Sequence, residues 1–147
     1  MQNFQTNSGI ALCLSLMLLL SPLVEAEEKT PDAIEGSVLV SAEEFIELVG
    51  KLPNLIVIDS RIPGDRKQGY VEGSVSLPDV DTTCETLKKN IPQTDLPTLF
   101  YCNGVKCGRS AKAVKIALSC GYNNIYWFRG GFKEWLAKGY PYLQAQF

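Results

Sequence analysis

Short apolar runs alternate along this chain with longer segments in which apolar residues recur at helical spacing. The runs are rich in β-branched and aromatic side chains and predict strands at 38–40, 55–58, 75–77, 98–101 and 125–128. The segments between them predict helices that begin near residues 41, 81, 110 and 131. Regular alternation of this kind predicts an α/β domain with a mainly parallel sheet.

Local signals define several boundaries of these elements. Ser41 and Glu44 form a capping-box pattern at the start of the first helix, and Asp81 is the expected cap of the second. Gly121 is expected to end the helix that begins at residue 110. Residues 63–69, with their Pro and Gly, predict a polar loop.

The N-terminal region has a different character from the rest of the chain. An apolar run at 10–20 is followed by a Ser-Pro break and by small residues up to Ala26, which predicts a secretory signal peptide. Because no Lys or Arg precedes the run, an uncleaved membrane anchor remains an alternative. We therefore expect a signal peptide at 1–26, a flexible leader at 27–36 and the folded domain at 37–147. The expected location is the periplasm, with no membrane attachment after cleavage.

Composition limits the chemistry. The chain has a net charge of −2 and scattered lysines, so we expect no nucleic-acid partner. It contains no histidine, which excludes a Cys–His pair, and we expect neither a metal nor a cofactor. Cleavage after residue 26 would leave four cysteines, and three full pairings are open for them in an oxidising compartment. These cysteines are Cys84, Cys102, Cys107 and Cys120.

The main candidate for catalysis is Cys102, which ends a predicted strand and precedes a Gly-rich loop and a helix start. Loop N–H groups and the helix N-terminus favour negative charge at such a point, and Lys106 and Arg109 add positive charge. This environment predicts a lowered pKa for the Cys102 thiol. We assign substrate binding to the loop, which comprises Asn103, Gly104, Val105, Lys106, Cys107, Gly108 and Arg109.

Two further features accompany Cys102. Cys107 has two interpretations of equal weight: a resolving thiol that attacks a persulfide or sulfenate on Cys102, or a structural disulfide partner or spare thiol. Asp59 and Arg61 follow a buried strand, and we expect them to form a supporting ion pair rather than to act in catalysis.

Several ordered motifs resemble the rhodanese (sulfurtransferase) family over roughly residues 37–142. They are SAEEF at 41–45, VIDSR at 57–61, GYVEGSVSLP at 69–78, the segments 100–102 and 108–111 on either side of the loop, and YWFRGGF at 126–132. The resemblance implies a three-layer fold, with a five-stranded parallel core sheet and helices on both faces, and a persulfide carried by Cys102. Tyr70 and Glu72 stand where the family usually has His and Pro, and the loop at 103–108 is longer than usual.

The resulting hypothesis is an exported, monomeric sulfurtransferase that moves sulfane sulfur from a small anionic donor to a thiol or other nucleophile, such as a protein thiol. Because the loop is longer than usual for the family, it is open whether thiosulfate is the donor. A thiol–disulfide redox module that uses Cys102 and Cys107 is the alternative, and a non-catalytic binding domain ranks third. The donor, the acceptor and the pairing of Cys84 and Cys120 stay open at this point.

Overall fold

Five parallel strands form a single sheet in the order β1-β5-β4-β2-β3. The structure is a computed structural model that describes residues 1–2 and 29–144, so nearly all of the expected signal peptide lies outside the described residues. The all-parallel sheet confirms the predicted fold class. The strands are β1 (Ser37–Leu39), β2 (Ile56–Asp59), β3 (Val75–Ser76), β4 (Thr98–Tyr101) and β5 (Ile125–Phe128).

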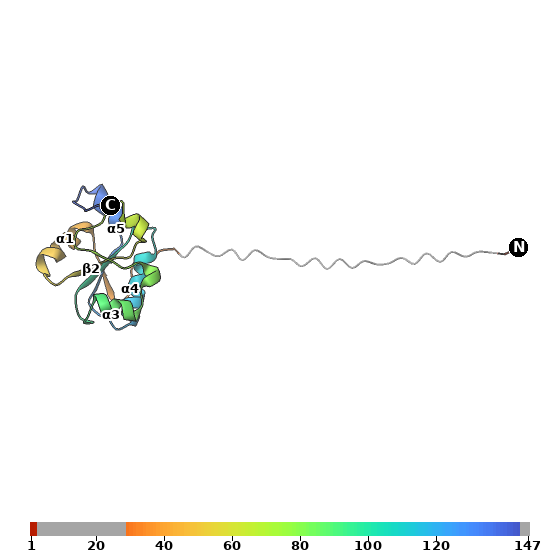
Figure 1. The fold of residues 1–147 in the computed structure, drawn as a ribbon, viewed down its shortest axis with the longest axis horizontal. Helices are drawn as coiled ribbons and strands as arrows, with labels where there is room; N and C mark the ends of the chain where they lie inside the picture. Colours follow the sequence, from red (N-terminus) through yellow and green to blue (C-terminus); the bar gives the residue numbers. More distant parts are fainter. Residues whose placement is uncertain (3–28, 145–147) are drawn as a thin grey trace.

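Helices cover both faces of this sheet (Figure 1). Side chains alternate across the strands, so Ile58, Phe100 and Trp127 pack in one apolar cluster and Val57, Leu99 and Phe128 in the other. The first cluster lies under α3 and α4, and the second lies under α1 and α5. The helices are α1 (Ala42–Lys51), α2 (Pro63–Arg66), α3 (Cys84–Asn90), α4 (Arg109–Ser119) and α5 (Gly131–Ala137), with a 3-10 turn, η1 (Asp79–Asp81).

The starts of α1, α4 and α5 agree with the sequence pattern, whereas two other helices differ from it. Ser41 caps α1 through the expected capping box with Glu44. The predicted cap at Asp81 is wrong, because Thr83 forms its own capping box with Thr86 and α3 therefore begins at Cys84. The predicted loop at 63–69 contains α2, whose first residue is a proline, the residue best suited to a first helical position.

The segment before β1 lies against the domain, in contrast to the flexible leader that the sequence predicts. Thr30 and Ile34 are buried. Arg129 donates from Nε to the carbonyl of Pro31 at 2.8 Å and pairs through Nη2 with Asp32 at 2.9 Å. Described residues from 29 onwards therefore extend the packed unit beyond the expected boundary.

A disulfide joins Cys84, at the start of α3, to Cys120, just after α4. Both helices cover the same face of the sheet, which brings two cysteines 36 residues apart in sequence into contact. Cys102 and Cys107 are the free cysteines of the part of the chain that the structure describes. The disulfide thus leaves both thiols of the predicted active-site loop available for chemistry.

Strand register gathers the candidate residues at one edge of the sheet. Asp59 at the end of β2 pairs with Tyr101 at the end of β4, and Tyr101 pairs with Phe128 at the end of β5. In parallel sheets the loops after the carboxyl ends of strands form the usual binding sites. Cys102 therefore starts its loop at the edge where functional residues are expected.

Candidate functional site

Cys102 is held in a fully buried position directly after β4. Its side chain is 0% exposed, and its thiol donates to the carbonyl oxygen of Cys107 at 3.0 Å. The Ser110 hydroxyl donates to the Cys102 sulfur at 3.2 Å, and Trp127 Nε1 in turn donates to Ser110 Oγ at 3.0 Å. This chain of donors orients the hydroxyl toward the sulfur and would stabilise extra negative charge there. We assigned neither Ser110 nor Trp127 to the site from the sequence.

The start of α5 fixes the base of the loop. Backbone N–H groups of Phe132 and Lys133 donate to the carbonyls of Cys102 and Asn103 at 2.8 and 2.9 Å. Gly131 has a φ of +60°, and a Cβ there would overlap the Cys102 carbonyl, so only glycine allows this approach. The N-terminal donors of α5 therefore bind the protein's own loop.

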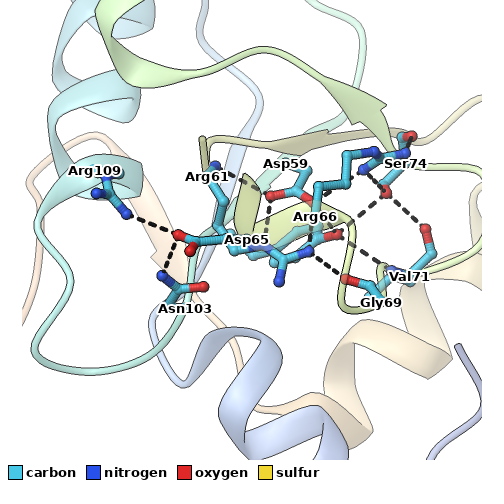
Figure 2. A network of polar contacts seen from close by, with 10 residues as sticks. Asp59, Arg61, Asp65, Arg66, Gly69, Val71, Ser74, Asn103 and Arg109 are labelled. Atoms are coloured by element: carbon cyan, nitrogen blue, oxygen red, sulfur yellow. Dashed lines mark hydrogen bonds and ion pairs between the residues drawn. The ribbon is translucent and has the colours of Figure 1, made fainter. Parts of the chain in front are cut away.

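Asp65 connects the two ends of the loop. Its Oδ2 accepts from Asn103 Nδ2 at 2.7 Å and from Arg109 Nη1 at 3.1 Å (Figure 2). Arg109 Nε also lies 3.8 Å from Asp79 Oδ1. Two carboxylates thus offset the charge of Arg109, a residue that we expected from the sequence to face a substrate. The sequence does not indicate this role of Asp65, which lies in a segment predicted as a loop, 38 residues before Asn103.

An open pocket of about 510 Å³ lies over the loop. Half-buried Cys107 is one of its lining residues and fully buried Cys102 is not. The Cys107 N–H donates to the Gly104 carbonyl at 2.8 Å, so this part of the loop is a tight turn. The residues that line the pocket are Asn103, Gly104, Val105, Lys106, Cys107, Gly108, Arg109 and Lys133.

The two thiols have opposite pKa shifts. Interaction with the Cys102 side chain lowers the pKa of Cys107 to about 5, against the effect of burial, and backbone N–H groups of Asn103 and Arg109 contribute further. Interaction with Cys107 and burial together raise the pKa of Cys102, and the hydrogen bond from Ser110 opposes them only in part. The expectation of a lowered pKa at Cys102 is therefore wrong. The N–H groups of Asn103 and Arg109 favour a thiolate at Cys107, and the Ser110 N–H at the start of α4 lowers the pKa of Cys102 only in part.

Asp59 and Arg61 form a buried ion pair at the end of β2 (Figure 2). Arg61 donates from Nε and Nη2 to the two carboxylate oxygens of Asp59 at 2.9 and 2.7 Å, and Nη2 also donates to the Gly69 carbonyl. Burial opposes ionisation of Asp59, but its hydrogen bonds and the charge of Arg61 lower the pKa of Asp59. Arg66 pairs with the same carboxylate at 2.9 Å. These contacts stabilise the edge of the sheet, and none of them involves a cysteine.

Tyr101 couples this ion pair to the strand that carries Cys102. Its hydroxyl donates to Asp59 Oδ2 at 2.9 Å and accepts from the Val71 N–H at 3.3 Å. Burial and the nearby charge of Asp59 raise the pKa of Tyr101 to about 12, so the hydroxyl keeps its proton. The residue before Cys102 is thereby fixed in place on the opposite face of the sheet from Trp127.

One buried hydroxyl at the same edge has no hydrogen-bond partner among the described residues. Ser60 Oγ makes no hydrogen bond to any described residue, although the Ser60 N–H donates to the Tyr101 carbonyl at 2.9 Å. That backbone contact places Ser60 beside the end of β4. An unsatisfied buried hydroxyl is uncommon and costs stability.

The arrangement as a whole supports nucleophilic sulfur chemistry. Two thiols share one loop, with hydrogen-bond donors directed at both sulfurs. Among the described residues, no group of three or more His, Cys, Asp or Glu side chains is placed to bind a metal ion. Within the same part of the chain, no helix has both the length and the apolar character to cross a membrane.

Comparison with known proteins gives consistent results. The family model described as "Rhodanese-like domain" matches residues 41–138. A relative from Bacillus subtilis (strain 168), the uncharacterized protein YqhL, is 34% identical over 83 residues, which cover 56% of this chain and 61% of the relative. The chain therefore matches less than two thirds of the length of that relative.

Solved structures share the architecture. The polysulfide-sulfur transferase homodimer from Wolinella succinogenes superimposes with a TM-score of 0.62 at 24% identity, over 76% of this chain and 81% of the other. A thiosulfate sulfurtransferase from Pseudomonas aeruginosa gives a TM-score of 0.63 at 18% identity, over 75% of this chain and 21% of the other. At these identities the two structures establish a shared fold.

Proposed function

The chain belongs to the rhodanese-like domain family, and on that premise we propose that it is a sulfurtransferase in which Cys102 carries the transferred sulfur as a persulfide. The observation that carries this proposal is the donor chain from Trp127 through Ser110 to the Cys102 sulfur. Similar folds in proteins described as polysulfide-sulfur and thiosulfate transferases support it.

The proposed reaction has two displacements at sulfur. In the first, the Cys102 sulfur bonds to the outer sulfur of an anionic donor, whose remaining part leaves with the electron pair, and the thiol proton is released. In the second, an acceptor thiolate attacks that outer sulfur, takes it and leaves the Cys102 thiolate. Lys106 and Lys133, which line the pocket, provide positive charge for the donor, and the partners are a small sulfur donor and a thiol acceptor.

The test is steady-state turnover with cyanide as acceptor and either thiosulfate or a polysulfide as donor. Wild-type protein should form thiocyanate with at least one donor, and Cys102→Ser should form none. Ser119→Ala, an exposed change on α4, is the matched control and should keep the wild-type rate. Turnover that survives in Cys102→Ser would contradict the assignment of the nucleophile.

A thiol–disulfide redox role is a second candidate, because Cys102 and Cys107 are both free and the Cys102 thiol donates to the Cys107 carbonyl. Titration against glutathione redox buffers would test it. A redox module should cycle through a Cys102–Cys107 disulfide and show no sulfur transfer. Sulfur transfer without that disulfide would exclude the redox role.

We also propose that the protein is exported and loses residues 1–26. The disulfide between Cys84 and Cys120 supports an oxidising compartment, where structural disulfides persist. Intact-mass analysis of the periplasmic fraction should find a chain that begins at Glu27. A membrane-bound chain that retains Met1 would contradict cleavage and favour the anchored alternative.

A further inference from the structure

The two loop thiols differ in their access to the pocket. Cys102 is fully buried beneath the loop, and its thiol proton is directed at the Cys107 carbonyl. Cys107 lies among the residues that line the open pocket, together with Lys106 and Lys133. A donor anion in that pocket therefore meets the sulfur of Cys107 before that of Cys102.

The fold resists a direct approach to Cys102. Its carbonyl is fixed by the start of α5, and Asp65 ties Asn103 to Arg109 on either side of the loop. Direct attack by Cys102 on a donor would need these contacts to open. Transfer from a neighbouring thiol within the same loop would leave those contacts closed, since the two cysteine side chains already interact.

We propose that Cys107 is the receiving thiol of this enzyme, which takes sulfane sulfur from an anionic polysulfide-type donor in the pocket and passes it inward to Cys102. This inference rests on the sulfurtransferase function proposed above. It makes Cys107 the first nucleophile of the reaction and replaces the direct attack of Cys102 on the donor with transfer through Cys107.

The chemistry balances without an added oxidant. The Cys107 thiolate attacks the outer sulfur of the donor, and the donor's remaining sulfur chain leaves with the electron pair of the broken S–S bond. The Cys102 sulfur then attacks the outer sulfur of the Cys107 persulfide. The bond from that sulfur to Cys107 breaks, the proton of Cys102 moves to the Cys107 sulfur, and the persulfide anion now lies on Cys102 beside Ser110.

The electrostatics of the loop favour this order. The lowered pKa of Cys107 keeps its sulfur ionised at neutral pH, whereas Cys102 retains the proton that the second step requires. The Ser110 hydroxyl, which accepts a hydrogen bond from Trp127, then stabilises the negative charge of the Cys102 persulfide. Each thiol thus has the protonation state that its step in the relay needs.

The experiment follows sulfur on each cysteine separately. The purified, pre-reduced protein is mixed with sodium tetrasulfide, quenched with an alkylating agent at short times and digested with trypsin. Cleavage after Lys106 places Cys102 and Cys107 on different peptides, so mass analysis locates the added sulfur. In the wild type, the Cys107 peptide should gain a sulfur atom first and the Cys102 peptide should gain it afterwards.

Variants separate the two steps. Cys102→Ala should load Cys107 at the wild-type rate and hold the sulfur there, and Cys107→Ser should load Cys102 more slowly by about tenfold or more. Cys107→Ala provides a second side chain at that position, and circular dichroism establishes that each variant is folded. Loading of Cys102 at the wild-type rate in both Cys107 variants would overturn the relay and leave the sulfurtransferase function standing. A folded wild type that gains no sulfur at either cysteine would overturn both proposals.

Discussion

Removal of the Cys102 thiol should change the acidity of Cys107 by an amount that the structure allows us to work out. Interaction with the Cys102 side chain is the largest cause of the lowered Cys107 pKa, and we take its size as that of one hydrogen bond. A hydrogen bond to a charged group contributes about 1.5–3 kcal/mol, and one pKa unit corresponds to about 1.4 kcal/mol. Cys102→Ala should therefore raise the pKa of Cys107 by about 1–2 units, from about 5 to about 6–7.

The assay is the rate of alkylation of Cys107 by iodoacetamide between about pH 4 and 9, read on the tryptic peptide that begins at Cys107. Only the thiolate reacts. Because the pKa of Cys107 is lowered, its reactivity should be full at neutral pH and should be lost as the pH falls through that pKa. At pH 6 the thiolate fraction should fall from about nine tenths in the wild type to between about a half and a tenth in Cys102→Ala.

Two further variants make the reasoning specific. Cys102→Ser keeps a hydroxyl donor and should show a smaller rise than Cys102→Ala. Ser110→Ala removes the hydrogen bond from Ser110 to Cys102 and keeps the Cys102 side chain beside Cys107. The pH midpoint of Cys107 alkylation should therefore move much less than in Cys102→Ala. An unchanged midpoint in Cys102→Ala would refute the argument that interaction with the Cys102 side chain sets the acidity of Cys107.

Three stability predictions concern other parts of the structure. The Cys84→Ser/Cys120→Ser double variant removes a cross-link over 36 residues, and urea unfolding should show a loss of about 3.8 kcal/mol on the chain-entropy relation; a change below about 1 kcal/mol would contradict it. Ser60→Ala removes a buried hydroxyl without a partner among the described residues and should leave stability unchanged or raise it by about 1 kcal/mol; a clear loss in the same assay would reveal a partner. Arg61→Met leaves the Asp59 carboxylate buried without its bidentate partner and should cost about 3 kcal/mol at pH 7. Since the stranded carboxyl group would then bind its proton more readily, part of that loss should be recovered as the pH falls, and a loss that grows instead would refute the argument.

The positions of the strands along the chain could be predicted from local sequence pattern alone. Buried parallel strands are short apolar runs, and β4 and β5 have the bounds that the sequence predicts. The capping box at Ser41 was equally readable, because both of its hydrogen bonds join residues three apart in sequence. Local signals succeeded where the interacting residues are neighbours in the chain.

Contacts between distant segments could not be predicted in this way. The pairing of Cys84 with Cys120 depends on α3 and α4 covering the same face of the sheet, which follows from strand order. The role of Asp65 depends on α2 reaching the loop 38 residues further along the chain. Neither contact can be inferred from the pattern of residues next to Cys84 or Asp65 in the sequence.

The acidity of the two thiols shows the same limit at the site itself. The sequence places Cys102 between a strand and a helix start, and the structure retains that placement. Which N–H groups each thiol meets depends on the path of the loop: those of Asn103 and Arg109 act on Cys107, and that of Ser110 acts on Cys102. The position of the Cys102 backbone likewise depends on α5, which lies beyond the next strand in the chain and binds the Cys102 carbonyl.

The most direct test of the central claim follows a labelled sulfur through a single turnover. Donor labelled in its sulfane sulfur is mixed with excess protein, acceptor thiol is then added, and the label is measured on the peptide that contains Cys102. We predict that label accumulates on Cys102 before the acceptor is added and leaves this peptide at the rate at which the acceptor gains it. Label that reaches the acceptor without residing on Cys102, or that does so equally well in Cys102→Ser, would contradict the account.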